Sequence, residues 1–158
     1  MTSLPDGYSL HSARGIDALP VRLFHDIARL RQEVFVVEQE CPYLDLDGRD
    51  AEETTTQYWV LFESDGTHEI AATIRVLDEG HREPGLPAIG RVATSERHRS
   101  LGLAAALVGA AVADFGEGPL VLEAQTYLVE WYRRFGFEVS GPGYIEDGIP
   151  HTQMRHAG

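Results

Sequence analysis

The sequence predicts an α/β (α+β) protein, a mixed sheet flanked by helices, built as one domain over residues 1–158. A chain of 158 residues usually forms a single hydrophobic core. Its segments follow the order strand, helix, two or three antiparallel strands, helix, strand, helix, strands, which favours a mixed sheet over pure βαβ alternation. No GxGxxG turn is present, so the spacing excludes a dinucleotide-binding Rossmann fold.

The first third of the chain predicts a strand, a helix and a long loop. Polar and apolar residues are mixed over residues 8–14 as in a short strand. A helix over residues 21–35 follows Pro20, and its apolar side chains recur at helical spacing at Leu23 or Phe24, Ile27, Leu30 and Val34. Residues 41–56, CPYLDLDGRDAEETTT, form a loop broken by proline and glycine, and loops of this length are often functional.

The middle of the chain predicts a hairpin followed by a strand, a turn and a helix. Residues 58–63 and 70–77 are rich in β-branched and aromatic side chains and are separated by turn residues, which is typical of a β-hairpin. Another strand-like run covers residues 88–94. The alanine-rich residues 101–115 predict a helix that ends before Gly116.

The last third predicts the remaining strands and one short helix. Residues 120–124 form a strand, and residues 128–135 form a helix closed by Gly136. Residues 137–139 and 151–155 supply the last two strands. With 43% hydrophobic and 24% charged residues, the chain has the composition of an ordinary globular protein.

The charge of the chain indicates which classes of partner are favoured, and its cysteine content indicates the cellular compartment. A net charge of −12 disfavours nucleic acid as a partner, because nucleic-acid-binding surfaces are cationic. The acidity fits either attraction for cationic amines or simple solubility. Cys41 is the sole cysteine, which excludes an intrachain disulfide and suits a reducing compartment. Without a signal-like or membrane-spanning stretch, the sequence predicts a cytoplasmic protein with no membrane partner.

The turn between the strand 88–94 and the following helix has the chemistry of an anion site. A helix start exposes backbone N–H groups and the positive end of the helix dipole. Gly102 would let a phosphate approach the backbone, Ala104 keeps the next turn slim, and Arg99 adds a positive charge. The same residues also fit an ordinary helix start that happens to contain a glycine.

The pattern Arg-x-x-Gly-x-Ala of this turn resembles the Arg/Gln-x-x-Gly-x-Gly/Ala signature of the Gcn5-related N-acetyltransferases (GNAT superfamily). Further segments resemble the ElaA-like branch of that superfamily, and together they cover nearly the whole chain. They read LRQEVFVVEQECPYLDLDGRD, GRVATSERHRSLG, YLVEWYRRFGF and EDGIPH. The stretch with Arg31, Phe35, Glu38 and Gln39 before CPYLDLDG is the most specific of them.

The resemblance implies the GNAT acyl-CoA N-acyltransferase fold, a six- to seven-stranded mixed sheet flanked by helices and splayed between strands 4 and 5. It also implies acetyl-CoA as cosubstrate and no metal. Strands 4 and 5 map to residues 88–94 and 120–124. The coenzyme-binding residues carried over are Val92, Ala93 and Thr94 for the pantetheine arm, Arg99, Ser100, Leu101, Gly102, Leu103 and Ala104 for the pyrophosphate, and Gln125 as a polar contact.

Two residues are catalytic candidates. By resemblance, Tyr132 carries the hydroxyl beside the coenzyme sulfur and acts as the general acid, although a tyrosine on a short helix often only packs. Glu123 lies within the strand that borders the splayed cleft and could relay a proton from the amine through water. Gln125 follows the same strand, and a plain loop amide is its other reading.

The acceptor side is predicted from acidic residues and one histidine. Glu38, Asp45, Asp47 and Asp50 gather where family members bind the acceptor, and their charge would favour a cationic amine. A solvated acidic loop is the alternative for each aspartate. His151 of EDGIPH could line the same pocket and titrate near neutrality, or it could be structural.

Other features of this region argue against additional chemistry. The acidic loop does not have the glycine and terminal glutamate positions of a calcium loop, and no Cys/His pairing has zinc spacing. Gln57 stands where relatives tend to place a histidine, so an acid–base role of that histidine would be absent. Cys41 lacks a basic environment in the sequence and is interpreted as structural.

These features predict an N-acetyltransferase that moves the acetyl group of acetyl-CoA to a primary amine by direct attack in a ternary complex. The acceptor would be a small-molecule or peptide amine. Dimers are common in the superfamily, so the resemblance is compatible with a homodimer. The alternative is a non-catalytic acyl-CoA sensor or interaction module on the same fold, since a fold does not fix function.

Overall fold

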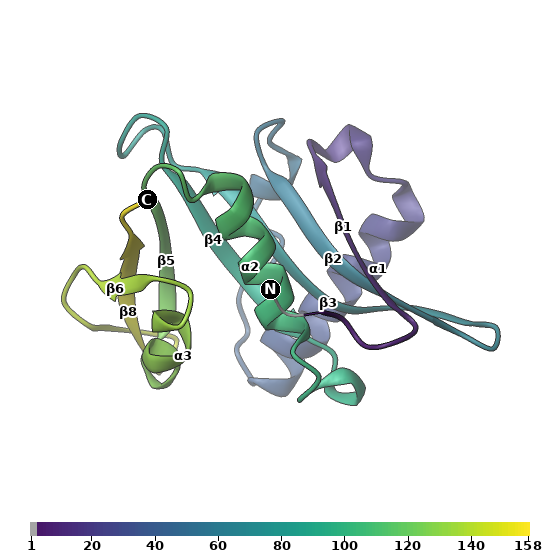
Figure 1. The fold of residues 1–158 in the computed structure, drawn as a ribbon. Helices are drawn as coiled ribbons and strands as arrows, with labels where there is room; N and C mark the ends of the chain where they lie inside the picture. Colours follow the sequence, from purple (N-terminus) through teal and green to yellow (C-terminus); the bar gives the residue numbers. More distant parts are fainter. Residues whose placement is uncertain (1–2) are drawn as a thin grey trace. The chain divides into compact units, whose positions relative to one another are not determined.

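The computed structural model describes residues 3–158 as two compact units that alternate along the chain (Figure 1). The first unit runs up to Arg75 and resumes from Arg91 to Leu107, and the second contains Val76–Gly90 and Val108–Gly158. Each unit contributes strands of a mixed sheet together with helices. The predicted fold class is therefore confirmed.

The first unit contains the strands that begin the sheet, in the order β1, β2, β3, β4. They are β1 (Tyr8–Arg14), β2 (Thr56–Ser64), β3 (Thr67–Asp78) as far as Arg75, and β4 (Pro87–Thr94) from Arg91. β1 runs antiparallel to β2, from the pair Tyr8↔Phe62 to the pair Arg14↔Thr56. Asp65 and Gly66 have positive φ values of 45° and 83° between β2 and β3, as a tight hairpin turn requires.

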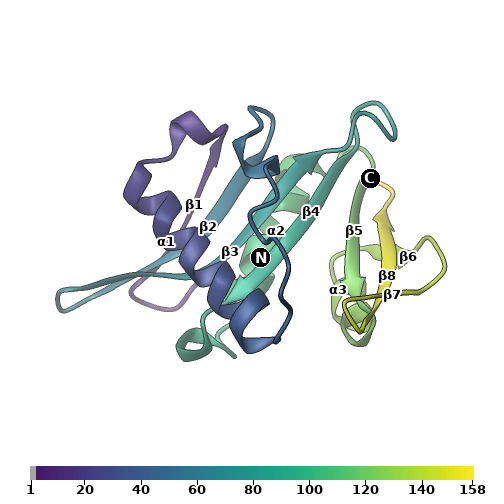
Figure 2. The ribbon, with the colours of Figure 1, turned by 180° about the vertical axis from the view of Figure 1, so that it is seen from behind.

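Helix α1 (Val21–Arg31) covers one face of the first unit's strands (Figure 2). Its apolar side is buried because Ile27 and Leu30 enter a core shared with the strands. That core also contains Trp59 of β2, Ile70 of β3 and Ala93 of β4. The helical spacing of apolar residues therefore identified the face that packs.

The predicted helix over residues 21–35 does not continue as a regular α-helix. From Gln32 to Glu38 the chain forms a π-helix, with Gln39 N–H donating to Val34 O at 3.3 Å and Cys41 N–H to Val36 O at 3.2 Å, five residues back. The wider turn accompanies burial of the neighbouring side chains Val34 and Phe35. The helical spacing of apolar residues continues through Ile27, Leu30 and Val34, so it does not show where the hydrogen-bond pattern changes.

The second unit continues from the first part of β4 through β5 (Leu120–Gln125), β8 (Ile149–His156) and β6 (Phe137–Val139) in that order. β5 is antiparallel to β8, from Leu120↔His156 to Gln125↔His151. The three-residue strand β7 (Tyr144–Glu146) pairs with β8 and was not predicted.

Two helices belong wholly or partly to the second unit. α2 (Leu103–Phe115) starts in the first unit and ends in the second, and α3 (Val129–Arg133) is a short helix before Gly136. Short 3₁₀ segments complete the elements at η1 (Ile16–Ala18), η3 (Arg49–Ala51), η4 (Glu96–His98) and η5 (Thr126–Leu128). No helix within residues 3–158 is long and apolar enough to cross a membrane.

The junction of β4 and β5 is the place where the resemblance predicts a splayed sheet. The parallel pairing covers Ala88↔Val121 and Ile89↔Leu122. Immediately afterwards, at Arg91, the backbone of β4 takes a φ of 53°, a left-handed value that is uncommon for a residue with a side chain. This left-handed residue directly precedes Val92–Thr94, the segment predicted to contact the pantetheine arm.

Candidate functional site

The predicted coenzyme turn lies in the first unit between η4 and α2. Arg99 is extended, with φ −75° and ψ 161°, and it is followed by Ser100 with φ 64° and Gly102 with φ 77°. Left-handed residues in a turn direct successive backbone N–H groups toward one side, which forms an anion-binding concavity. Ser100 adopts the conformation that glycine takes most readily, so this turn is held against a backbone preference.

The start of α2 supplies the remaining donors. The first helical hydrogen bond runs from Ala106 N–H to Gly102 O at 3.0 Å, so the amides of Leu103 to Ala105 precede the helical ladder. They lie at the positive end of the helix dipole. Leu103 is buried while Leu101 and Gly102 are exposed, so the turn is anchored by one apolar side chain and open to solvent. This geometry suits a pyrophosphate.

Arg99 is held beside this turn by two partners. Its guanidinium donates to both carboxylate oxygens of Glu38 at 2.6 Å and to Thr94 O at 3.2 Å. The hydrogen bonds and charge of Arg99 lower the pKa of Glu38 below its ordinary value. Glu38 ends the π-helix, so this ion pair joins the end of the helical segment to the coenzyme turn.

His98, just before the turn, is a buried anchor. Its ring hydrogen-bonds the Tyr8 hydroxyl at 2.7 Å through Nδ1 and the Glu69 carboxylate at 2.5 Å through Nε2. The Tyr8 and Phe62 rings pack against it with centroids 5.5 Å and 5.0 Å away. Contacts from β1, β2 and β3 therefore fix the chain between β4 and the turn.

A buried ionic network joins the loop after the π-helix to the strands. Arg31, 1% exposed, donates to Asp50 Oδ1 at 2.5 Å and to Asp45 Oδ2 at 3.0 Å. Arg75 of β3 donates to Asp50 Oδ2 at 2.9 Å and to both oxygens of Asp47 at 2.8 and 2.9 Å. Guanidinium groups suit such bidentate pairing.

This network changes the interpretation of the acidic loop. Asp45 and Asp50 are buried, so they are not part of a solvated acidic loop. Their charges and that of Asp47 are paired with arginines, so the loop does not present three unpaired anions to a cationic amine. Gln57 is also buried and donates to Asp50 Oδ1 at 2.8 Å. Only Asp47, 31% exposed, is partly open to solvent among these aspartates.

Tyr132 of α3 lies in an aromatic environment in the second unit. Its side chain is 5% exposed, with ring centroids 4.8 Å from Trp131 and 6.3 Å from Phe137. Burial, together with Tyr127, raises the pKa of Tyr132 above its ordinary value, so the phenol keeps its proton. Such a hydroxyl can donate a hydrogen bond or a proton, but it does not serve as a base.

Glu123 of β5 accepts two hydrogen bonds. The Tyr144 hydroxyl donates to it at 3.0 Å and the Gln153 amide at 3.2 Å. Burial and the Glu123 charge raise the pKa of Tyr144. Tyr144 also stacks on His151, with ring centroids 5.6 Å apart. The His151 Nδ1–H donates to Ile149 O at 2.8 Å, so in the neutral ring Nε2 is the acceptor.

The two catalytic candidates lie on opposite faces of the second unit's strands. Phe137 pairs with His156, which pairs with Leu120, so these three side chains share one face. Tyr132 contacts Phe137 and belongs to that side. Glu123 is an odd number of residues from Leu120 and lies on the other side, the side of Gln125, His151 and Gln153. The register therefore separates the predicted acid from the predicted base.

Sequence reasoning missed three participants of these clusters. Arg75 and Arg91 are charged residues inside otherwise apolar strands, and this exception to the strand pattern was the available signal. Tyr144 lies in the unpredicted strand β7, and its short sequence gave no strand signal.

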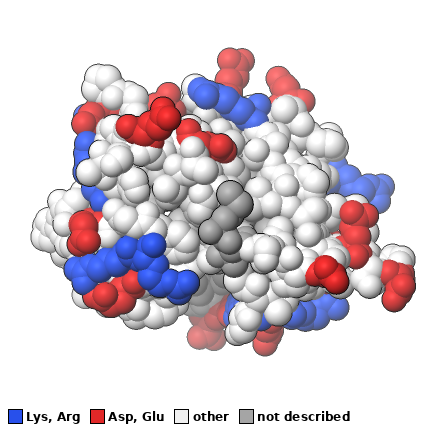
Figure 3. All heavy atoms as spheres, viewed as in Figure 1, with Lys and Arg blue, Asp and Glu red and all other residues white. Residues whose placement is uncertain are grey.

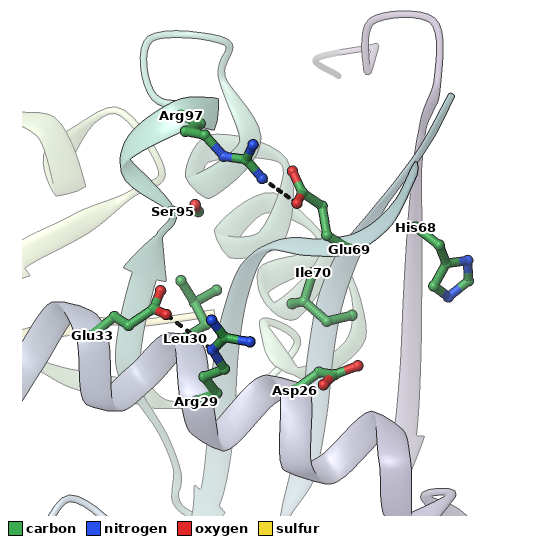
Figure 4. A pocket seen from close by; sticks show the side chains of 9 residues that line it. All are labelled: Asp26, Arg29, Leu30, Glu33, His68, Glu69, Ile70, Ser95 and Arg97. Atoms are coloured by element: carbon green, nitrogen blue, oxygen red, sulfur yellow. Dashed lines mark hydrogen bonds and ion pairs between the residues drawn. The ribbon is translucent and has the colours of Figure 1, made fainter. Parts of the chain in front are cut away.

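The hollow that the structure contains near the turn is polar and lies in the first unit. Its volume is about 460 Å³, and α1, β3 and the segment after β4 line it (Figure 4). Its lining residues form two ion pairs, Arg29–Glu33 and Arg97–Glu69. Among residues 3–158, no group of three or more His, Cys, Asp or Glu side chains could hold a metal ion.

The surface also shows how charge is distributed. On the face drawn in Figure 3, arginines lie beside acidic side chains and do not gather into a basic patch. Every one of the 13 residues counted as lysine or arginine is an arginine.

The chain is similar in sequence and fold to known proteins. Residues 30–157 match the acetyltransferase (GNAT) domain family. A UPF0039 protein of Mycobacterium tuberculosis is 39% identical over 146 residues, 92% of this chain and 90% of that protein. The crystal structure of an acyl-CoA N-acyltransferase from Pseudomonas aeruginosa superposes with a TM-score of 0.84 at 35% identity, covering 95% and 99% of the two chains.

The crystal structure of Escherichia coli ElaA superposes with a TM-score of 0.83 at 30% identity, covering 94% of this chain and 99% of that one. These similarities support acyltransferase activity with an acyl-CoA as cosubstrate, the donor that GNAT acyltransferases use. Both the family match and the ElaA similarity agree with the motifs in the sequence. The chain belongs to the GNAT acetyltransferase family and to its ElaA-like branch.

Proposed function

We propose that this protein is an N-acetyltransferase that moves the acetyl group of acetyl-CoA to a primary amine by direct attack in a ternary complex. The observation that carries the proposal is the turn from Arg99 to Ala104. Its left-handed residues Ser100 and Gly102 directly precede the start of α2. In such an arrangement backbone N–H groups can converge on an anion, which supports a pyrophosphate at this turn.

The other coenzyme-binding residues are proposed from the resemblance to the GNAT family. The backbone of Val92, Ala93 and Thr94 would pair with the pantetheine arm, and the Gln125 amide at the end of β5 would add a polar contact. Arg99 would contribute its positive charge to the pyrophosphate. Leu101, Leu103 and Ala104 would shape the turn, with the Leu103 side chain as its buried anchor.

The chemistry needs a proton acceptor and a proton donor. The amine nitrogen attacks the thioester carbonyl carbon, the carbon–sulfur bond breaks, and the amine proton passes to Glu123 through water. Tyr132 gives its proton to the departing thiolate and regains one from solvent. A buried phenol is a weak acid, but a hydrogen bond to the thiolate stabilises the leaving group. Because acid and base lie on opposite faces, donor and acceptor would approach from opposite sides.

The acceptor side is proposed to include Glu38, Asp47 and His151. Glu38 and Asp47 are both partly exposed, and each is paired with an arginine, so an amine would contact either carboxylate in competition with Arg99 or Arg75. His151 is stacked on Tyr144 and keeps Nε2 as an acceptor for an amine proton. Small-molecule and peptide amines both satisfy this chemistry.

The test is a screen of amines with purified protein, acetyl-CoA and a thiol-release readout. The lone Cys41 is buried, and the chain has no lysine, so neither thiol background nor acetylation of its own lysines obscures the signal. The proposal predicts turnover with at least one amine and a large loss in Tyr132→Phe. Acetyl-CoA binding without turnover across polyamines, small amines, peptide N-termini and lysine peptides would favour the sensor.

A further inference from the structure

Arg91 is the point at which β4 is strained. Its φ of 53° lies in the left-handed region, which is unfavourable for a residue with a side chain. Such a conformation persists only where surrounding contacts hold it. Arg91 is followed directly by Val92, Ala93 and Thr94, the strand segment assigned to the coenzyme arm.

The contacts that hold Arg91 come from the loop after the π-helix. Arg91 Nε lies 2.8 Å from Asp45 Oδ1, and its Nη2 donates to Asp45 O at 3.1 Å and to Asp47 Oδ2 at 3.4 Å. The guanidinium also lies 5.5 Å from the centre of the Tyr43 ring. The Arg91 side chain, 22% exposed, therefore contacts two carboxylates, a carbonyl and an aromatic face. The contact of Nε with Asp45 Oδ1 is an ion pair without hydrogen-bond geometry, whereas Nη2 makes the hydrogen bonds.

The loop that grips Arg91 is itself fixed. Asp45 is bound by the buried Arg31 of α1, and Asp47 is bound at both oxygens by Arg75 of β3. Burial and pairing of this kind make the network rigid, because removing one partner leaves an uncompensated buried charge. Arg91 is thus tied through the loop to two other elements of the first unit.

We propose that Arg91 is a positioning residue: its ion pairs with Asp45 and Asp47 hold the β4 backbone so that Val92–Thr94 present their amides and carbonyls to the acyl thioester. This inference rests on the proposed function for its chemical meaning. The restraint of residues 92–94 by the Arg91 side chain does not depend on the proposed function. Misplacement of a reacting group by about 1 Å can cost on the order of 100-fold in rate.

The deciding variant is Arg91→Gly. Glycine adopts a φ of 53° without strain, so the backbone conformation stays accessible while its side-chain restraint is removed. Arg91→Lys is the conservative variant, since it retains the charge but cannot make the forked contacts. Arg49→Gln is the matched control. Arg49 lies in the same loop, but it pairs with Glu52.

The first readout is amide hydrogen exchange of the peptide spanning residues 88–95 in the ligand-free protein. We expect exchange of residues 92–94 to rise about tenfold in Arg91→Gly, to rise less in Arg91→Lys and to stay unchanged in Arg49→Gln. Urea unfolding of each variant separates local loosening from global destabilisation. Unchanged exchange in Arg91→Gly would overturn the inference, as would exchange that rises only in proportion to lost global stability.

The second readout is kinetic. We expect kcat to fall roughly 10- to 100-fold in Arg91→Gly while the Kd for coenzyme A changes less than about threefold, because the turn at 99–104 is untouched. Equal changes in kcat and Kd across the three variants would contradict a positioning role. If the unsubstituted protein shows no turnover, the proposed function fails, whereas hydrogen exchange still decides whether Arg91 restrains the strand.

Discussion

Glu38 and Arg99 form a bidentate ion pair, with both oxygen–nitrogen distances at 2.6 Å, directly beside the coenzyme turn. The Glu38 carboxylate occupies donors of the arginine that a phosphate would also use. Both side chains are partly exposed, so the pair is easily exchanged for another anion. The pair therefore couples the proposed acceptor residue to the proposed coenzyme residue.

Glu38→Gln is expected to tighten coenzyme A binding by about two- to fivefold, because the neutral amide competes less with the pyrophosphate for Arg99. Isothermal titration calorimetry at low ionic strength measures this change. Glu33→Gln is the control, since Glu33 pairs with Arg29 on the same helical segment and not with the turn. Weaker binding in Glu38→Gln would show that the carboxylate supports Arg99 instead of competing for it.

Tyr132→Phe is expected to lower kcat about 100-fold with little change in coenzyme affinity, because only the hydroxyl that meets the thiolate is removed. Steady-state kinetics and calorimetry on the same preparations separate the two effects. Tyr127→Phe is a suitable control, since Tyr127 is exposed. Equal loss in both variants would contradict the assignment.

The raised pKa of Tyr132 predicts a stability difference at high pH. The folded state keeps this proton at a pH where the unfolded chain, with an ordinary pKa of about 10, loses it. The contribution of the buried neutral phenol is therefore complete below pH ~10 and declines as the pH rises further. Urea unfolding of the wild type and Tyr132→Phe between pH 8 and 11 should show a steeper decline in the wild type, and parallel curves would contradict this.

The ionic network predicts loss of stability in acid. Burial alone would raise the pKa of Asp50, but the hydrogen bond and charge of Arg31, together with Arg75, lower it below its ordinary value. A lowered pKa means that the stabilisation is present above pH ~4 and is lost as the pH falls. Asp50→Asn should lower the free energy of unfolding by about 3–5 kcal/mol at pH 7. Below pH 4 its free energy of unfolding should fall less than that of the wild type.

Glu52→Gln is the control for that experiment, because Glu52 pairs with Arg49 in a more exposed part of the loop. It should change the free energy of unfolding by less than about 1 kcal/mol. Similar losses in the two variants, measured by urea unfolding, would show that the buried network does not dominate the stability of the first unit.

Glu123→Gln is expected to lower kcat/KM about 100-fold, because an amide cannot take the amine proton. The exchange keeps the size of the side chain and an acceptor for the Tyr144 hydroxyl. Glu138→Gln on strand β6, which pairs with β8, provides a control. Unchanged kcat/KM in Glu123→Gln would exclude Glu123 as the base.

Much of the fold could be predicted because local patterns determine it. The strands β1 and β6 lie at the predicted residues, and α2 begins two residues after its predicted start, since the turn at Ser100 to Gly102 precedes it. The π-helix could not be predicted, because its hydrogen bonds shift by one residue while helical spacing of apolar residues continues up to Val34. β7 depends on its pairing with β8 and not on its own three residues.

Part of the candidate site could likewise be proposed from the sequence, and part could not. The predicted coenzyme turn is a continuous stretch, so its residues could be proposed from the sequence and stay a prediction. The Arg31, Arg75 and Arg91 contacts join residues that are distant in the chain, and only the folded structure brings them to the aspartates. Asp45 and Asp50 therefore looked like surface charges in the sequence and are internal ion-pair partners in the structure.

The most direct test of the central claim is a calorimetric titration of acetyl-CoA into the wild type and Gly102→Glu. Gly102 has a φ of 77°, and a glutamate there adds strain, bulk and a negative charge where the pyrophosphate would lie. Gly85→Glu, at a positive-φ glycine in the connector before β4, is the control. We expect saturable binding of acetyl-CoA to the wild type and the control and no detectable binding to Gly102→Glu. Unchanged affinity in Gly102→Glu would contradict the central claim.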